Sequence, residues 1–507
     1  MLRCVTLCVL LVLNYGFAGA LFVDGCPIFG CRPSGSFSFY LNIPKDNATV
    51  NWISDIVLDP VPNVLGCVAD SVNIVCQSNG PFDDDKGYVS LYGDNGTIRW
   101  KDKVLKLPTL PLLDNYGDVT GSDGNNLVHY DLFGKLYPII KCYGLRPMFS
   151  MQLVSTMYLL LVSENGALVV RDTNAIPVAT IYLNDTIQRS NGTFLPIAQP
   201  VVNGSRFYLL TEFVPEVDEY NPTVLNMQRL YAIDVHDRMV DIITVAWFFN
   251  FEMEYNRYEN DELKYNNENE RRHLATSIKR RDVVKNLKEN VISKQNVIWD
   301  GTRSSVYVSL PPPYAYSNQP STFWGFSDNG DSSNHLFRSY LDIDHMSTFE
   351  ADTYTSTSHA KDNTPTLWIS TTDSMIHSVN PDGNISTTID LQALLKASVT
   401  ITSKLSLIQQ NDTSEAYLIL AFTVSDPTPQ FAHTLRVFGV PPETTSLVLA
   451  LATNTSSGRI QWMVPVPDNM EVKGQISGSA GAASRRKDQM VFYAESANKT
   501  AKIISIH

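Results

Sequence analysis

Short apolar segments recur along the whole chain and are separated by turn-forming residues. The segments are rich in Val, Ile, Leu, Tyr and Thr, and Gly, Asn, Asp and Pro stand between them. Long runs with the 3.6-residue period of an amphipathic helix are scarce. Segments of this kind are typical of β-strands joined by tight turns. The pattern therefore predicts an all-β protein built from antiparallel meanders.

One unit of this pattern repeats. It consists of an apolar or aromatic strand, a turn of Asp, Asn and Gly, and a second strand that sometimes ends in Trp. Its clearest copy is the segment 91–100, LYGDNGTIRW. Further copies lie at 128–136, 168–172, 230–247, 323–330, 375–383 and 435–462. Where no insertion intervenes, the copies start 37 to 62 residues apart, which fits one four-stranded propeller blade per copy.

This spacing predicts a seven- or eight-bladed β-propeller. A single blade cannot bury both of its faces, whereas blades stacked around an axis bury them against one another. In an eighth blade, a strand at 36–43 would pair with strands at 489–495 and 502–506 and so close the ring. A pair of β-sandwiches is the alternative, because it also contains many short strands.

The order Leu-Tyr, Asp, turn Gly, strand and Trp resembles the repeat of quinoprotein-type (PQQ-repeat-like) β-propellers. Segments 91–100 and 230–247 carry the resemblance best, and degenerate copies extend it over most of the chain. It implies the propeller fold. Enzymes of that family bind pyrroloquinoline quinone beside a calcium ion and commonly have a vicinal Cys-Cys pair. This chain has no Cys-Cys sequence and no residue that matches a calcium ligand or a catalytic Asp. The resemblance therefore does not imply the activity, and we expect no cofactor and no bound metal.

A polar segment at 252–295 interrupts the repeat. Its first half is acidic and rich in Tyr and Asn, which predicts a loop, and its second half could form a helix with apolar residues on one face. Basic clusters at Arg271-Arg272 and Lys279-Arg280-Arg281 allow two interpretations. They are either processing sites for a dibasic protease or part of a solvated excursion between two blades.

The N-terminus has the pattern of a secretory signal peptide. Arg3 is followed by ten apolar residues from Cys4 to Leu13, and Ala18-Gly19-Ala20 offers small residues for cleavage. We expect residues 1–20 to be removed, leaving 21–507 as a single propeller domain; an N-terminal core strand is the alternative. No later segment contains 18 consecutive apolar residues, so we predict no membrane span and secretion to the extracellular space.

Five cysteines remain after residue 20, and all lie in the first third of the chain: Cys26, Cys31, Cys67, Cys76 and Cys142. Cys67 and Cys76 flank a hairpin-like stretch, and Cys26 and Cys31 could close a small loop, which would leave Cys142 over. Spacing alone leaves other pairings open. A zinc site is the other interpretation, but no C-x2-C motif is present, so we favour disulfides.

Nine N-x-[ST] sequons are candidate glycosylation sites. Asn95 and Asn384 lie in turn sequences between apolar segments, where a glycan can face water. The sequons lie at Asn47, Asn95, Asn184, Asn191, Asn203, Asn384, Asn411, Asn454 and Asn498. We expect some of them to be used.

Composition excludes several classes. The 507 residues are 44% hydrophobic and 18% charged, which is too apolar for a disordered chain, and the net charge of −13 argues against nucleic-acid binding. Motifs of catalysis are missing: there is no G-x-S-x-G, H-E-x-x-H or P-loop sequence. Asp234 lies near His236, and Asp342 near His345, a spacing common by chance. The cluster Asp83-Asp84-Asp85 is either a weak calcium site or a solvated turn.

These observations favour a secreted glycoprotein that acts as a binding scaffold. Its axial face would recognise an extracellular protein, a glycan or matrix, because loops on a rigid ring suit recognition. An extracellular hydrolase or oxidoreductase on the same scaffold is the second hypothesis, so enzymatic activity is left open, with binding preferred. An ER-lumenal propeller factor is the third, although the C-terminus has no retention signal.

Overall fold

A computed structural model shows the architecture. It describes residues 25–41, 48–54, 65–71, 73–78, 86–106, 108–114, 116–124, 126–142, 148–155, 158–172, 175–187, 190–216, 227–237, 242–251, 297–310, 321–348, 367–409, 416–453, 458–479 and 488–507. The following predictions lie outside the described residues: the signal peptide at 1–20, the insertion at 252–295, the acidic cluster at 83–85, and the sequons at Asn47, Asn411 and Asn454.

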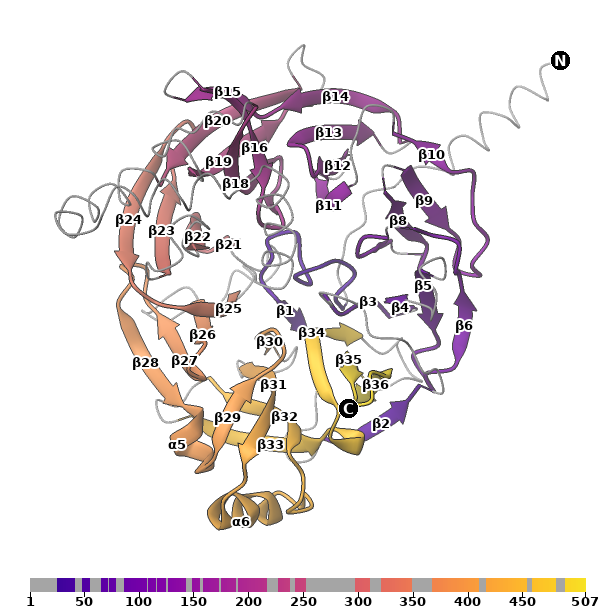
Figure 1. Ribbon diagram of the computed structural model, residues 1–507, viewed down its shortest axis with the longest axis vertical. Helices are drawn as coiled ribbons and strands as arrows, with labels where there is room; N and C mark the ends of the chain where they lie inside the picture. Colours follow the sequence, from indigo (N-terminus) through magenta and orange to yellow (C-terminus); the bar gives the residue numbers. More distant parts are fainter. Residues whose placement is uncertain are drawn as a thin grey trace, which may run out of the picture.

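The described strands form eight sheets arranged in a ring around a central axis, as Figure 1 shows. The chain is thus an eight-bladed β-propeller, one of the two blade numbers that the repeat predicted. We number the blades in chain order, and the strands of each four-stranded blade are named from the axis outwards. Blade 1 contains β3 (Cys67–Ala69), β4 (Ile74–Ser78), β5 (Gly87–Leu91) and β6 (Ile98–Lys101). Blade 2 contains β7 (Leu112–Leu113), β8 (Val119–Asp123), β9 (Asn126–Tyr130) and β10 (Ile140–Lys141).

Blades 3 to 6 follow along the chain. Blade 3 contains β11 (Met148–Val154), β12 (Tyr158–Ser163), β13 (Ala167–Asp172) and β14 (Pro177–Tyr182). Blade 4 contains β15 (Asn184–Ile187), β16 (Ser190–Pro196), β17 (Val201–Asn203), β18 (Arg206–Pro215), β19 (Gln228–Val235) and β20 (Ile243–Asn250). Blade 5 contains β21 (Val297–Asp300), β22 (Ser305–Leu310), β23 (Thr322–Asp328) and β24 (Ser333–Ser339). Blade 6 contains β25 (Ile343–Thr348), β26 (Leu367–Thr371), β27 (Met375–Val379) and β28 (Ile385–Asp390).

The last two blades use both ends of the chain. Two short helices flank blade 7, α5 (Leu391–Leu395) and α6 (Pro429–Val437). Blade 7 contains β29 (Ser398–Ile401), β30 (Ser406–Gln409), β31 (Ala416–Asp426), β32 (Ser446–Ala452) and β33 (Arg459–Pro465), with β1 (Ser38–Tyr40) added at its inner edge. Blade 8 contains β34 (Glu471–Ser479), β35 (Gln489–Glu495), β36 (Ala501–Ile506) and β2 (Val50–Ile53).

The ring closes in blade 8, but not through the N-terminal strand that the sequence suggested. The C-terminal strands were placed correctly, and their partner is β2, which pairs antiparallel with β36. The prediction for 36–43 was wrong: the strand found within it, β1, pairs in parallel with β30 beside the axis. β1 is mostly buried, whereas β2 is only partly buried, but nothing in the local pattern shows which of these two early segments reaches the C-terminal strands.

Apolar side chains fill the interfaces between neighbouring blades. Alternate residues of one strand point to the blade before and the blade after. Leu418 and Leu420 of β31 face blade 6, while Ile419 and Ala421 face blade 8. Because both faces of such a strand are buried, its sequence reads as a continuous apolar run, and β32 is buried along its whole length.

The repeated unit of the sequence corresponds to a contact between neighbouring blades. Trp100 lies in β6, the outer strand of blade 1, and its Nε1–H donates to the Leu132 carbonyl in the outer turn of blade 2 at 3.2 Å. In the same turn, a Cβ atom on Gly134 would lie only 2.4 Å from the Trp100 ring. Trp52 of blade 8 binds the outer turn of blade 1 in the same way, through the Gly93 carbonyl at 2.8 Å. The turn Gly and the terminal Trp therefore belong to one joint made from two successive copies.

Candidate functional site

The centre of the ring is occupied by the protein's own N-terminal segment, residues 25–41, which we call the axial plug. Figure 1 shows its indigo trace and β1 at the centre of the propeller. A disulfide between Cys26 and Cys31 closes its first loop. The buried side chains of Phe37, Phe39 and Leu41 anchor its second half.

Backbone hydrogen bonds join the axial plug to seven of the eight blades. Cys26 N–H donates to the carbonyls of Ala69 in blade 1 (2.7 Å) and Gly478 in blade 8 (3.0 Å). Plug carbonyls accept from inner-strand amides in the other five: Pro27 from Leu113 (2.9 Å), Pro33 from Val202 (2.7 Å), Ser34 from Trp299 (3.0 Å), Ser36 from Thr348 (3.0 Å) and Phe37 from Leu407 (2.9 Å). Ile28 packs in the cluster that contains Met148 and Met151 of blade 3. The plug therefore bonds to seven blades and shares an apolar cluster with the remaining one, blade 3.

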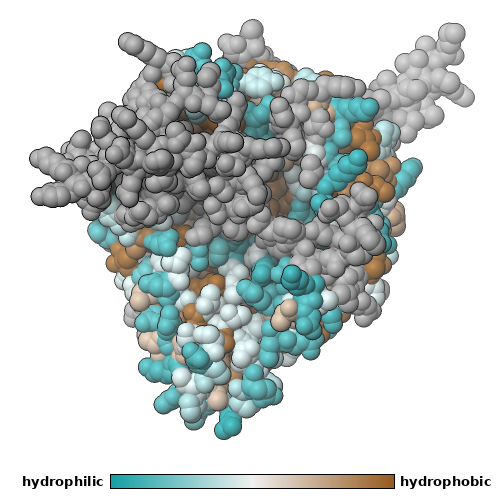
Figure 2. Space-filling view, in the orientation of Figure 1, coloured by the Kyte–Doolittle hydropathy of each residue, from teal (hydrophilic) through white to brown (hydrophobic). Residues whose placement is uncertain are grey.

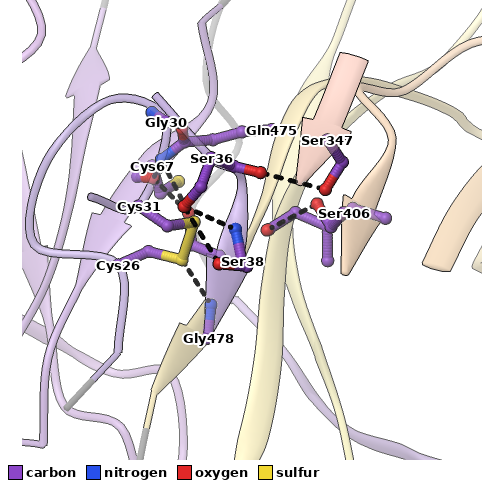
Figure 3. Close-up of a disulfide and its surroundings, with 12 residues drawn as sticks. Cys26, Gly30, Cys31, Ser36, Ser38, Cys67, Ser347, Ser406, Gln475 and Gly478 are labelled. Carbon is purple, nitrogen blue, oxygen red and sulfur yellow. Dashed lines mark hydrogen bonds between the residues drawn. A yellow bond between two sulfur atoms is a disulfide. The ribbon is translucent and has the colours of Figure 1, made fainter. Parts of the chain in front are cut away.

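Gln475 fixes the disulfide loop to the ring. Its side chain is fully buried. Its Oε1 accepts from Gly30 N–H at 2.9 Å, and its Nε2 donates to the Cys67 carbonyl at 2.7 Å and to Ser477 Oγ at 2.9 Å. One side chain thus connects the plug with blades 1 and 8, as Figure 3 shows.

Small residues on the inner strands make room for the plug. A Cβ atom on Gly478 would lie 2.4 Å from the Phe39 ring, so the backbone of β34 approaches this ring directly. Ser347 Oγ donates to the Ser36 carbonyl at 3.0 Å, and the Oγ atoms of Ser36 and Ser38 lie 2.9 Å apart. These buried hydroxyls satisfy plug groups that would otherwise be unpaired away from water.

The axial plug lies at one end of the channel. Strands within a blade are antiparallel, so the first-to-second and third-to-fourth connections of every blade emerge at the same end. The plug bonds to residues at or near the last residue of inner strands, such as Ala69, Val202 and Thr348, which are at that end. We call it the plug end; the second-to-third and blade-to-blade connections emerge at the opposite end.

Two disulfides are present among the cysteines that the sequence singled out. They join Cys26 to Cys31 and Cys67 to Cys76, and Cys142 is free and buried. Cys67 and Cys76 are directly opposite each other on β3 and β4, where their Cα atoms are 4.3 Å apart. This separation is typical of a non-hydrogen-bonded antiparallel pair, whose side chains are close enough to bridge.

The six sequon asparagines that the structure describes are all exposed. They belong to turns or to the β15–β16 hairpin, and they are Asn95, Asn184, Asn191, Asn203, Asn384 and Asn498. Asn95, Asn203 and Asn384 lie in connections at the plug end, and Asn498 lies at the opposite end. Their exposure is compatible with glycosylation, which stays a prediction.

The Asp and His residues that the sequence suggested as possible catalytic pairs make structural contacts instead. Within the described ranges, no group of three or more His, Cys, Asp or Glu side chains could hold a metal ion. Asp234 binds Arg206 at 2.6 Å, and His236 Nε2 lies 2.7 Å from Thr244 Oγ1. Asp342 accepts from Ser321 and Thr372 hydroxyls, both at 2.9 Å.

A charged cluster between blades 4 and 5 escaped the sequence analysis. Arg206 reaches both Asp234 and Asp328, and Asp328 also accepts from Tyr208 and from Trp247 Nε1. Burial alone would raise the pKa of Asp328, but the hydrogen bonds from Arg206 and Tyr208 outweigh it and hold that pKa below its usual value. The cluster is a joint between two blades.

The axial plug was also missed, although the sequence contains a signal for it. Gly25, Gly30 and Gly35 recur every five residues around Cys26 and Cys31. Such spacing is typical of a tightly turned segment rather than a strand. Nothing in the sequence indicates that this segment lies at the axis, because its partners come from positions 69 to 478.

The fold and the plug define a class: an eight-bladed β-propeller whose channel is closed at one end by its own N-terminal segment. No protein-family model matches the chain, and no curated protein matches it in sequence. Among the described residues, no helix is long and apolar enough to cross a membrane.

Solved propeller structures are similar to this chain. They include BamB from Moraxella catarrhalis (11% identity, 76% of this chain and 91% of that chain covered, TM-score 0.40). A quinohemoprotein alcohol dehydrogenase from Pseudomonas putida is similar too (11% identity, 96% of this chain and 80% of that chain covered, TM-score 0.39). So is a europium-containing methanol dehydrogenase (10% identity, 93% of this chain and 82% of that chain covered, TM-score 0.40). These neighbours include proteins of the quinoprotein type that the repeat resembles. Identities and TM-scores this low transfer no activity, and the fold rests on the chain's own sheet topology.

Proposed function

We propose that the protein is a secreted glycoprotein and a binding scaffold, and that it recognises an extracellular protein, glycan or matrix component through the end of the ring opposite the plug. The axial plug is the observation that supports this proposal. It fills the axis at one end and bonds to seven of the eight blades, so the connections of the opposite end are left to present a recognition surface on the ring.

The connections at that end suit recognition. They include the 19 residues between β31 and β32, which contain α6. In Figure 2 the coloured surface over blades 6 to 8 is mostly hydrophilic or neutral, with small separated hydrophobic patches. Polar surfaces with isolated apolar residues are typical of interfaces that form and dissociate.

Three observations support a secretory location. Disulfides persist in oxidising compartments, and two are present. The N-terminal pattern is that of a signal peptide, and each of the six described sequons is exposed. Expression of the full chain in cultured cells tests the location, because we expect the protein in the medium, with a mobility shift after glycosidase treatment. Retention in the cytosol without a shift would contradict it.

A pair of added glycans tests which end binds. Glu443→Asn creates the sequon Asn-Thr-Thr in the exposed connection after α6, at the end opposite the plug. Asp331→Asn creates Asn-Ser-Ser in the exposed β23–β24 turn at the plug end. Both positions are single exposed acidic residues, so the variants are matched in charge and in added bulk.

The measurement is saturable binding of the purified secreted protein to cultured cells and to cell-free matrix. We expect the Glu443→Asn protein to lose at least tenfold in affinity and the Asp331→Asn protein to bind as the unmodified one does. The reverse order would assign recognition to the plug end. Binding that does not saturate on either material would contradict the scaffold function itself.

A further inference from the structure

The outer turn of blade 1 places a sequon beside an exposed aromatic ring. Tyr92 N–H donates to the Thr97 carbonyl at 2.9 Å, and Gly96 N–H donates to the Tyr92 carbonyl at 2.9 Å. Tyr92 and Thr97 therefore face each other across the base of the turn, with Asn95 near its tip. Side chains of residues that face each other in an antiparallel pair emerge on the same face.

The carboxamide of Asn95 is oriented towards that face. Its Oδ1 accepts from Thr97 N–H at 3.0 Å and from the Thr97 hydroxyl at 2.8 Å, and Nδ2 makes neither of these bonds. Asn95 and Thr97 are both exposed. The Asn95 carboxamide is thus tied to Thr97, whose side chain emerges on the same face of the turn as that of Tyr92.

The ring of Tyr92 has room for a partner. Its side chain is 41% exposed, although most aromatic residues of the described chain are buried between blades. The Arg99 guanidinium lies 4.5 Å from the ring centroid. An aromatic face carries partial negative charge, so it attracts the partly positive C–H groups on one face of a pyranose as it attracts this cation.

We propose that Asn95 carries an N-linked glycan and that its first N-acetylglucosamine packs on the Tyr92 ring, fixing the outer turn of blade 1. The inference rests on the proposed secretory location. The donor is a lipid-linked oligosaccharide diphosphate. Asn95 Nδ2 attacks C1 of its first sugar, the C1–oxygen bond to the lipid diphosphate breaks, and the amide loses one proton as the N-glycosidic bond forms.

The test is site-resolved hydrogen exchange on the secreted protein and on Tyr92→Leu, each with its glycans and after amidase treatment. The amidase converts Asn95 to Asp in both proteins, so this conversion contributes equally to both glycan effects and cancels when the two effects are compared. We expect the glycan to slow exchange of the Gly96 and Thr97 amides about fivefold in the natural protein and to have no effect in Tyr92→Leu.

The β27–β28 turn provides the matched control. Its Gly383 N–H donates to the Asn380 carbonyl at 2.9 Å, and Pro381 stands three residues before Asn384, where Tyr92 stands relative to Asn95. Deglycosylation should leave Gly383 exchange unchanged. Mass spectrometry that finds Asn95 empty while other sequons are occupied overturns the site, and equal glycan effects with Tyr and Leu overturn the packing. If no sequon carries a glycan, the result contradicts the proposed secretory location, and the packing on Tyr92 falls with it.

Discussion

Gln475 and Glu212 are buried polar side chains whose surroundings differ. Gln475 uses both ends of its amide, joining Gly30, Cys67 and Ser477. Glu212 is 3% exposed on β18, and Gln228 donates to it at 3.4 Å. Satisfied buried amides stabilise a fold, whereas burial of a carboxyl favours its neutral form.

Gln475→Ala should destabilise the protein by about 3 kcal/mol, because it leaves Gly30 N–H and the Cys67 carbonyl buried without this partner. Denaturant unfolding measures the loss. Gln430→Ala, at an exposed position of α6, is the control and should change the free energy of unfolding by less than about 0.5 kcal/mol. Equal effects of the two substitutions would show that Gln475 does not hold the plug.

Glu212 should make stability depend on pH. Burial raises the pKa of Glu212 to about 8, above its unfolded value of 4.5, so the folded state keeps a proton that the unfolded state releases. The stability linked to this proton is complete below pH 4.5 and is lost as the pH rises through 8. We expect Glu212→Gln to gain stability relative to the natural protein steadily between pH 5 and 9 in unfolding titrations. A constant difference would contradict the raised pKa.

At the scale of elements, the joint between neighbouring blades explains the repeated sequence unit. The turn Gly of one blade packs against the indole ring of a Trp on the outer strand of the preceding blade. Gly96 packs on Trp52 in this way, and Gly134 packs on Trp100. Phe337 takes the place of Trp beneath Gly383. The copies degenerate because any large apolar side chain can fill this position, while the Gly must stay small.

Gly134→Ala tests the joint. Gly134 has a φ of 82°, and its Cβ would meet Trp100, whereas Gly439 has a φ of 70° with no atom near its Cβ position. Gly439→Ala should cost about 1–2 kcal/mol for the left-handed conformation alone. Gly134→Ala should cost about 1–3 kcal/mol more, because the contact with Trp100 is overpacked. Equal losses in thermal or denaturant unfolding would show that the joint contributes nothing.

The sequence predicted the blades better than their closure. Turn residues and apolar alternation are local, so the copies of the repeat and the strands at 489–495 and 502–506 could be placed. The pairing of Cys67 with Cys76 is local as well, since one hairpin contains both. The partners of the 36–43 segment are distant: β1 pairs with β30, nearly 370 residues away. No local pattern specifies a contact of that separation.

At the scale of the molecule, the axial plug turns a ring of nearest-neighbour contacts into one connected body. Without it, each blade would contact only the blades before and after it, and the ring would be held closed by the β2–β36 pair. The plug adds bonds from one segment to seven blades and an apolar contact to the remaining one.

The two disulfides should therefore differ in how much each contributes to the free energy of unfolding. Loop entropy alone gives about 2 kcal/mol for the Cys26–Cys31 loop and slightly more for the longer Cys67–Cys76 loop. The plug predicts the opposite order, because Cys26–Cys31 shapes a segment that contacts all blades, while Cys67–Cys76 lies within one hairpin. Paired Cys→Ser variants, compared by denaturant unfolding, measure both losses. A larger loss from the Cys67–Cys76 pair would contradict the plug's role.

Native-state hydrogen exchange at increasing denaturant tests the plug most directly. The amides of Val202, Trp299, Thr348 and Leu407 lie in four different blades and donate to four carbonyls of this one segment. If the plug is a single unit that ties the ring together, these four amides become exchangeable in one opening with one free energy. Four different opening energies, each matching the other amides of its own blade, would contradict it.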